Sequence, residues 1–170
     1  LKSYARKGGE AVEPVDLRRA VSSALTMMEP QLRSRTIRIN RSVPRQPVMV
    51  LADRIRLEQV IINLLRNAVD AVKDRRGAEI GITVAAGTHA YVSVHDNGPG
   101  VSDLEKLFEP FWTTKKPGEG TGLGLAISST IVADFGGRLT AHNETAGGAV
   151  FRVELPLHRP GEPQKALAAE

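Results

Sequence analysis

Apolar residues recur along the chain at two different periods, and the period changes from one segment to the next. Spacings of three and four residues, which are typical of helices with one buried face, predict three helices. These helices are expected over residues 17–30, 53–73 and 122–134. Asp16 and Asp53 are suitable N-cap residues for the first two, and Pro30 is expected near the end of the first, although apolar residues continue to Leu32. Gly136-Gly137 follows the third helix as a stop signal.

Strict alternation of apolar and polar residues, the pattern of a half-buried strand, marks most of the other regular segments. Such strands are expected at residues 36–40, 79–84, 91–96, 139–141 and 151–155, with a further short apolar run at residues 48–51. A turn at Gly87-Thr88 predicts that the second and third of these strands form a hairpin. Residues 97–120 have no period and are rich in glycine and proline, so we expect a binding loop or lid there.

The composition is that of one soluble globular domain. The 170 residues are 41% hydrophobic and 25% charged, and the absence of cysteine excludes disulfides, thiolate metal sites and thiol nucleophiles. No run approaches the roughly 18 apolar residues of a membrane span. Residues 1–56 hold 12 Lys and Arg against 5 Asp and Glu, whereas residues 57–170 hold 11 against 14. Because the basic residues of the first part are scattered and only Tyr4 is aromatic there, a solvated surface explains them better than a nucleic-acid interface.

The helix expected over residues 53–73 carries asparagines opposite its apolar stripe. Asn63 and Asn67 are four residues apart, so they share a face, although asparagine is a poor helix former. Isolated asparagines are most often part of a solvated polar surface. The functional alternative gives their amide oxygens a hard cation such as Mg²⁺, or the polar groups of a ligand.

Asp96 ends an expected strand and lies on the same side as Val92 and Val94. If the valines face the core, a carboxylate beside them needs hydrogen-bond donors, and the exocyclic amine of a purine is a suitable donor. Gly98 and Gly100 would allow the backbone to approach a flat ring. A plain strand-ending turn is the alternative, since the segment Asp-Asn-Gly-Pro-Gly is rich in turn-forming residues.

A third unusual segment, Gly-Glu-Gly-Thr-Gly-Leu-Gly-Leu-Ala at residues 118–126, leads into the last helix. Glycine costs about 1 kcal/mol relative to alanine inside a helix. Exposed backbone N–H groups at a helix N-terminus can bind phosphate, whereas a flexible loop with Thr121 as N-cap is the alternative. The spacing matches neither a P-loop nor a Rossmann fingerprint. In chain order, the three segments describe one nucleotide, with asparagines for a cation, a carboxylate for a purine and glycines for phosphates.

These segments, together with Phe-Glu-Pro-Phe at residues 108–111, resemble the N, G1, F and G2 boxes of the histidine kinase ATP-binding domain. The resemblance covers residues 14–158 and extends to the superfamily that includes DNA gyrase, Hsp90 and MutL. Residues 56–60, 67–71 and 111–115 are most similar to the nitrogen-regulatory and C4-dicarboxylate sensor kinases. The resemblance implies an α+β fold, a two-layer sandwich in which helices cover one face of a mixed, mostly antiparallel sheet.

The resemblance also implies ATP and Mg²⁺ as cofactors and assigns roles to individual residues. Asn67 would bind Mg²⁺, and Asn63 would contact the nucleotide where gyrase and Hsp90 carry a glutamate that activates water. Lys115 would contact the γ-phosphate, unless it is a solvent-exposed loop lysine, and these three residues would form the catalytic set. Further residues implied to bind ATP are Asp70, Asp96, Gly98, Gly100, Gly120, Thr121, Gly122, Leu123 and Gly124. Apolar anchors of the lid would be Phe108, Phe111 and Trp112.

Kinases of this family phosphorylate a histidine that is usually followed by Glu or Asp on a dimerising helix pair. Only His95-Asp96 has that dipeptide here, and it lies on an expected strand, so we expect the acceptor outside this chain. The domain interpretation follows: residues 1–13 as a remnant of the dimerisation helix and a linker, 14–158 as the catalytic domain, and 159–170 as a disordered tail. We expect a cytoplasmic, largely monomeric fragment of a parent that could be membrane-anchored. Its partners would be its own dimerisation domain and, indirectly, a response regulator, but not nucleic acid.

Two other functions are compatible with the same motifs. A nucleotide-driven dimerisation clamp of the gyrase or MutL type would hydrolyse ATP, but Asn63 is a poor base and the 14–158 span is short for such a clamp. A nucleotide-binding module without catalysis is the weaker possibility.

Overall fold

The computed structural model describes residues 12–162. Its regular elements are β1 (Glu13–Asp16), α1 (Leu17–Ser34), β2 (Arg38–Ser42), β3 (Met49–Ala52), α2 (Arg54–Ala71), β4 (Glu79–Ala86), β5 (His89–Asp96), α3 (Gly124–Asp134), β6 (Arg138–Asn143) and β7 (Ala149–Pro156). Five strands form one sheet in the order β2-β4-β5-β7-β6, and β1 and β3 form a separate pair. Only β2 and β4 run parallel in the larger sheet, which is therefore mixed and mostly antiparallel, as expected.

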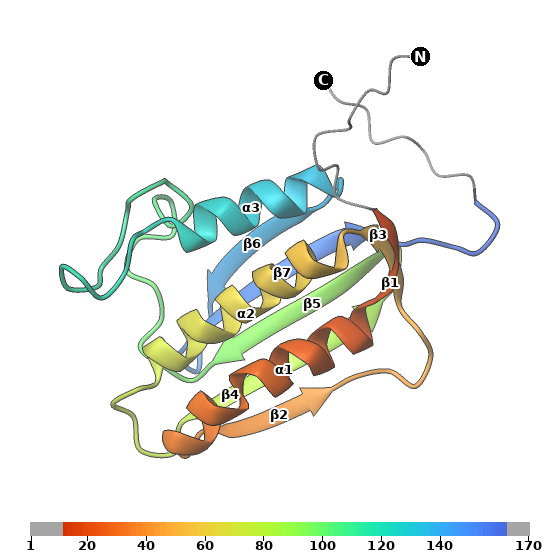
Figure 1. Ribbon diagram of the computed structural model, residues 1–170. Helices are drawn as coiled ribbons and strands as arrows, with labels where there is room; N and C mark the ends of the chain where they lie inside the picture. The colour runs from red at the N-terminus through yellow and green to blue at the C-terminus, as the bar shows by residue number, and fades with distance from the viewer. Residues whose placement is uncertain (1–11, 163–170) are drawn as a thin grey trace, which may run out of the picture.

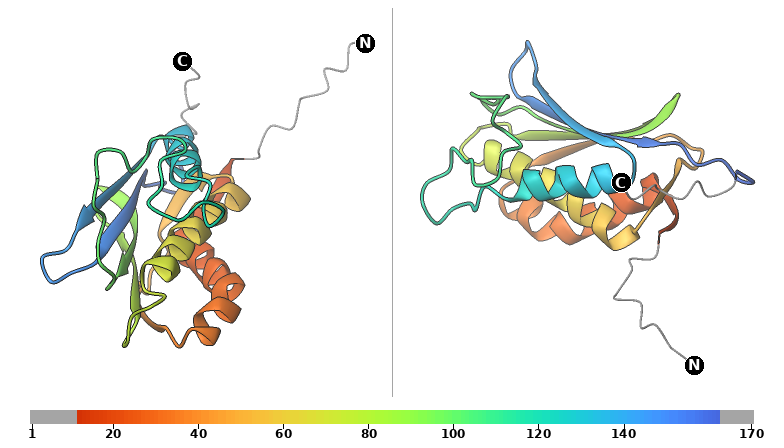
Figure 2. Two further views of the ribbon diagram at one scale, coloured as in Figure 1. Left: turned by 90° about the vertical axis from the view of Figure 1, so that its left-hand side faces the viewer. Right: turned by 90° about the horizontal axis from the view of Figure 1, so that it is seen from above.

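The three helices cover one face of the five-stranded sheet (Figure 1). Figure 2 shows the helices and the sheet as two distinct layers. The alternation within β5 explains this arrangement, because Val92 and Val94 are buried against the helices while Ser93 and His95 turn to the other face. The two-layer α+β sandwich that the family resemblance implies is confirmed.

The first two helices begin where their caps predict. The Asp16 carboxylate accepts from the N–H of Arg18, and the Asp53 carboxylate accepts from the N–H of Arg56. Pro30 lies near the end of α1, as expected, and the helix continues for one more turn, to Ser34. Pro30 lies on the exposed side of the helix, where water can replace the missing hydrogen bond. Among the described residues, no helix is long and apolar enough to cross a membrane.

Strand β1 begins at Glu13, the last residue of the predicted linker, and the sequence did not predict it. Its residues pair antiparallel with β3, with Val15 opposite Val50. A four-residue strand with one buried side chain carries too short a pattern to be recognised without its partner. The predicted dimerisation-helix remnant up to residue 11, and the predicted tail from residue 163 onward, lie outside the described residues.

The segment between β5 and α3 contains no helix or strand, as its lack of period predicts. It loops out beyond the neighbouring ends of α2 and α3 (Figure 1). The third helix begins at Gly124 rather than near residue 122, because Gly122 has a φ of +68°, which is not helical. Thr121 is not the N-cap. Its hydroxyl accepts from the N–H of Leu123 at 3.4 Å, and Leu123, at the cap position, makes no side-chain cap bond.

Candidate active site

The C-terminal half of α2 presents three polar side chains along one face. Asn63, Asn67 and Asp70 follow one another at spacings of four and three residues, and each is half-buried. Within residues 12–162 the Asn67 side chain makes no hydrogen bond, so its amide is free to meet a ligand. The predicted sharing of a face is therefore confirmed, and the other two motifs are placed by their contacts with this helix.

Asp96 closes β5 with its carboxylate on the helix side of the sheet. Its side chain is 2% exposed, and its Oδ1 accepts from the N–H of Gly98 at 2.9 Å. Burial raises the pKa of the Asp96 carboxyl, while the backbone N–H groups of Gly98 and Ala149 and the charge of His95 act in the opposite direction. Burying a charged carboxylate costs free energy because it loses its water, and a ligand that donates a hydrogen bond to the carboxylate would offset part of that cost.

The turn after Asp96 is tied to α2 at one glycine and to β6 at the other. A Cβ at Gly98 would lie 2.7 Å from the carbonyl oxygen of Ala71, so only glycine lets this turn reach the end of α2. Gly100 has a φ of +82° and packs against Asn143. The Asn143 side-chain oxygen accepts from the N–H of Val101 at 2.7 Å, and its Nδ2 donates to the carbonyl of Val101 at 2.8 Å. Sequence reasoning missed Asn143, which belongs to no recognisable motif.

The glycine-rich segment places the N-terminus of α3 directly against α2. A Cβ at Gly124 would lie 2.5 Å from Oδ1 of Asn63, and the Asn63 Nδ2 donates to the hydroxyl of Ser128 at 3.1 Å. Gly122 packs equally closely on the backbone of Phe111, whose N–H donates to the Gly122 carbonyl at 2.9 Å. Exposed N–H groups at the start of α3 therefore lie next to the first asparagine of α2.

Lys115 also reaches α2 from the loop. Its Nζ forms an ion pair with Oδ2 of Asp70 at 2.5 Å, and both side chains are about one-third exposed, at 33% and 32%. A Cβ at Gly120 would lie 2.7 Å from Cδ of Lys115, so the glycine makes room for the lysine stem. Lys115 is therefore not a solvated loop lysine, and its ammonium lies over the last turns of α2.

The three aromatic residues predicted to anchor the lid behave differently. Phe108 and Trp112 are half-buried and pack on the core. Phe111 is 74% exposed, so the prediction is wrong for this residue. Its backbone lies in the left-handed region at a φ of +67° and is held by Gly122, which turns the side chain outward. Leu107, in the same loop, is buried, although no periodic pattern marks it.

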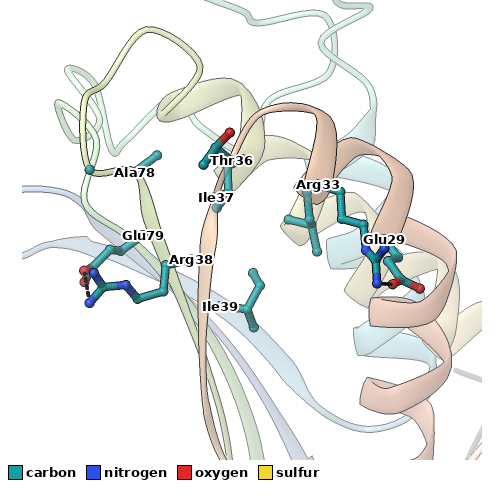
Figure 3. Close-up of a pocket in the computed structure, with 10 residues that line it drawn as sticks. Glu29, Arg33, Thr36, Ile37, Arg38, Ile39, Ala78 and Glu79 are labelled. Atoms are coloured by element: carbon teal, nitrogen blue, oxygen red, sulfur yellow. Dashed lines mark ion pairs between the residues drawn. The ribbon is translucent and has the colours of Figure 1, made fainter.

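A cavity of about 600 Å³ lies elsewhere, between the end of α1, β2 and the start of β4. Leu32, Ile37, Ile39 and Ala78 contribute apolar lining, and the ion pairs Glu29–Arg33 and Arg38–Glu79 lie beside them (Figure 3). None of the residues predicted to bind the nucleotide lines this cavity. Its cationic side chains are already paired, so the polar face of α2 is the better candidate for a phosphate ligand.

Comparison with known proteins matches this arrangement to a family. A family model described as "Histidine kinase-, DNA gyrase B-, and HSP90-like ATPase" matches residues 52–159, more than half of the chain. The C4-dicarboxylate transport sensor protein DctB of Pseudomonas aeruginosa is 39% identical over 165 residues, and the match covers 95% of this chain. The chain spans only 27% of the length of that relative.

Solved structures of histidine kinases share the fold. The catalytic domain of histidine kinase ThkA superposes with a TM-score of 0.76 at 34% identity, covering 86% of this chain and 95% of that domain. ThkA in complex with the response regulator protein TrrA gives a TM-score of 0.73 at 32% identity, covering 85% of this chain and 41% of that chain. Full-length ShkA in complex with AMPPNP superposes with a TM-score of 0.75 at 31% identity, and the match covers 88% of this chain and 32% of that chain.

The region matched by the family model begins in β3 and extends past β7, so it contains every residue discussed above on α2, at the end of β5 and in the loop before α3. The family resemblance seen in the four sequence motifs is thus confirmed. The chain belongs to the histidine kinase-, DNA gyrase B- and HSP90-like ATPases, and within this family it is a catalytic domain of the histidine kinase type.

Proposed function

We propose that the chain binds ATP with Mg²⁺ on the polar face of α2 and transfers the γ-phosphoryl group to a histidine outside this chain. The observation that carries the proposal is the convergence of three motifs on one helix. Gly98 meets the end of α2, Gly124 meets Asn63, and Lys115 pairs with Asp70. ShkA, a structural neighbour, is solved with AMPPNP, an ATP analogue, which supports a nucleotide as the ligand.

The adenine end of the nucleotide belongs beside Asp96. The carboxylate would accept a hydrogen bond from the exocyclic amine, while the backbone of the turn that contains Gly98 and Gly100 would line the ring. The side chain is 2% exposed, so the hydrogen bond would be shielded from competing water.

The phosphate end belongs between α2 and the start of α3. The backbone N–H groups of the segment from Gly120 to Gly124, including Thr121, Gly122 and Leu123, would donate hydrogen bonds to phosphate oxygens near the N-terminus of α3. Asn67, whose amide has no partner in residues 12–162, is suited to ligate Mg²⁺ through its oxygen. When bound, Mg²⁺ would neutralise charge on the phosphates during transfer.

The transfer itself requires charge stabilisation more than a base. A lone pair on the acceptor imidazole forms the new P–N bond, the bond from Pγ to the bridging oxygen breaks, and ADP leaves with that oxygen. The phosphorylated ring then gives up its remaining excess proton to a base. Lys115, already held over α2 by Asp70, would stabilise the charge on the γ-phosphate. Asn63 is an amide and a poor base, which favours transfer to histidine over activation of water.

The structure also supports an acceptor in another domain. His95, the histidine that precedes an acidic residue, lies on β5 with its side chain exposed on the sheet face opposite the buried Val94 and Asp96. It therefore cannot reach a phosphate held between α2 and α3. ThkA is solved with a response regulator, which supports the proposed downstream partner, and a dimerisation domain and a cytoplasmic location belong to the same proposal.

The chain should phosphorylate a supplied acceptor but not itself. We expect radiolabel from [γ-³²P]ATP and Mg²⁺ to appear on a separately purified, matched dimerisation domain, as an acid-labile phosphohistidine. The chain incubated alone should remain unlabelled. An acceptor domain whose histidine is replaced by glutamine is the control. Labelling of the chain itself, or no transfer to a matched acceptor by a chain that binds ATP, would contradict the kinase proposal.

A further inference from the structure

The buried face of α3 begins with a polar residue. The residues that α3 buries are Ser128, Ile131 and Val132, and Phe135 follows them on the same side. This spacing predicts an apolar side chain at position 128, yet the structure has a serine there that is only 2% exposed. Ser128 and Asp96 are the two buried polar side chains of the described residues. A buried hydroxyl is costly unless it is hydrogen-bonded, so its partner indicates its role.

That partner is the side chain of Asn63 on the neighbouring helix α2. The amide has a donor end, Nδ2, and an acceptor end, Oδ1, and a half-turn of the side chain would exchange them. Nδ2 donates to the Ser128 hydroxyl at 3.1 Å, which directs Oδ1 toward the first residue of α3. Gly124 is that residue, and a Cβ there would lie 2.5 Å from Oδ1. Ser128 and Gly124, one helical turn apart, therefore receive the two ends of the same amide.

We propose that Ser128 is a positioning residue, which accepts from Nδ2 of Asn63 and so holds Oδ1 at the N-terminus of α3, facing the phosphates of the nucleotide. The inference rests on the proposed function, because it gives Asn63 a contact with those phosphates or their cation. A merely structural serine would instead join α2 to α3 without affecting the nucleotide. Asn63 is half-buried, so water can reach Nδ2 when the hydroxyl is removed, and we expect the fold to survive that change.

A double-mutant cycle on the affinity for Mg²⁺·ATP separates the two roles. Ser128→Ala should weaken binding by about two- to tenfold, as expected for the loss of one orienting hydrogen bond. Asn63→Ala should weaken binding at least as much. Adding Ser128→Ala to Asn63→Ala should then cost nothing further, because no amide remains to be oriented. Ser129→Ala is the matched control, since its side chain makes no hydrogen bond within residues 12–162, and it should bind like the unmodified chain.

Each outcome of the cycle has a distinct meaning. Unchanged affinity in Asn63→Ala would contradict the proposed role of Asn63 and remove the inference with it. A loss in Asn63→Ala without a loss in Ser128→Ala, or equal losses from Ser128→Ala in both backgrounds, would overturn positioning while leaving the proposed function intact. The side-chain amide protons of Asn63 give a second readout in the unmodified chain. Slow exchange with water is expected for the proton donated to Ser128, and fast exchange of both protons would overturn the proposal.

Discussion

Asp96→Asn is expected to lower the affinity for Mg²⁺·ATP by about ten- to a hundredfold, the cost of losing a buried hydrogen bond to a charged group. The Gly98 N–H donates to Oδ1 of Asp96 at 2.9 Å, so an asparagine would turn its own oxygen toward that donor. Its NH₂ group would then face the adenine amine, and two donors would meet where a donor and an acceptor met before. Isothermal titration calorimetry of both chains measures the difference.

The control for this substitution is His95→Asn, which introduces the same side chain one residue earlier. His95 is exposed on the opposite face of β5, so this variant should keep the affinity of the unmodified chain. GTP sharpens the comparison, because guanine presents a carbonyl where adenine presents its amine. We expect the preference for ATP over GTP to shrink in Asp96→Asn. A fully folded Asp96→Asn chain with undiminished ATP affinity would contradict the adenine site.

Asn67→Ala should remove most of the gain in ATP affinity that Mg²⁺ provides. The amide is half-buried on α2 and makes no hydrogen bond within the described residues, so its loss should cost the fold little. Loss of one charge-stabilising ligand should also slow transfer to a supplied acceptor by about a hundredfold or more. The measurement is ATP affinity with Mg²⁺ and with EDTA, followed by the initial rate of transfer.

Arg66→Ala is the matched control for Asn67→Ala. Arg66 is the preceding residue of α2 and is exposed, and its guanidinium has no acceptor atom that could ligate Mg²⁺. This variant should retain both the Mg²⁺-dependent gain and the transfer rate. If Asn67→Ala and Arg66→Ala respond alike to Mg²⁺, Asn67 is not a ligand of the cation.

The parts of the fold that depend on local signals could be predicted from the sequence. The helix α2 carries its N-cap, Asp53, and its apolar stripe within one segment, and the β4–β5 hairpin closes over a short turn. The pairing of β1 with β3 and the parallel pairing of β2 with β4 join residues far apart in the chain. No local period encodes such a pairing, which is why β1 was missed and the parallel neighbour of β2 could not be named.

In the candidate site, too, local signals could be predicted from the sequence and long-range contacts could not. The motifs and their order predicted which residues gather, because each motif breaks a local rule of its helix, strand or loop. The contacts that orient them could not be predicted, since Asp70 and Lys115 are 45 residues apart and Asn63 and Ser128 are 65 apart. The exposure of the Phe111 side chain could not be predicted either, because it depends on the hydrogen bond from the Phe111 N–H to the Gly122 carbonyl and not on the aromatic side chain itself.

Binding of ATP between Asp96 and the N-terminus of α3 is tested most directly by nuclear magnetic resonance. A ¹⁵N-labelled chain would be titrated with Mg²⁺·AMPPNP while the backbone amide signals are followed. We predict that the largest shifts occur at Gly98, Gly122 and Gly124, and that Ile39 and Ala78, which line the cavity beside α1, stay unchanged. Shifts confined to that cavity, or no shifts at saturating nucleotide, would contradict the site described here.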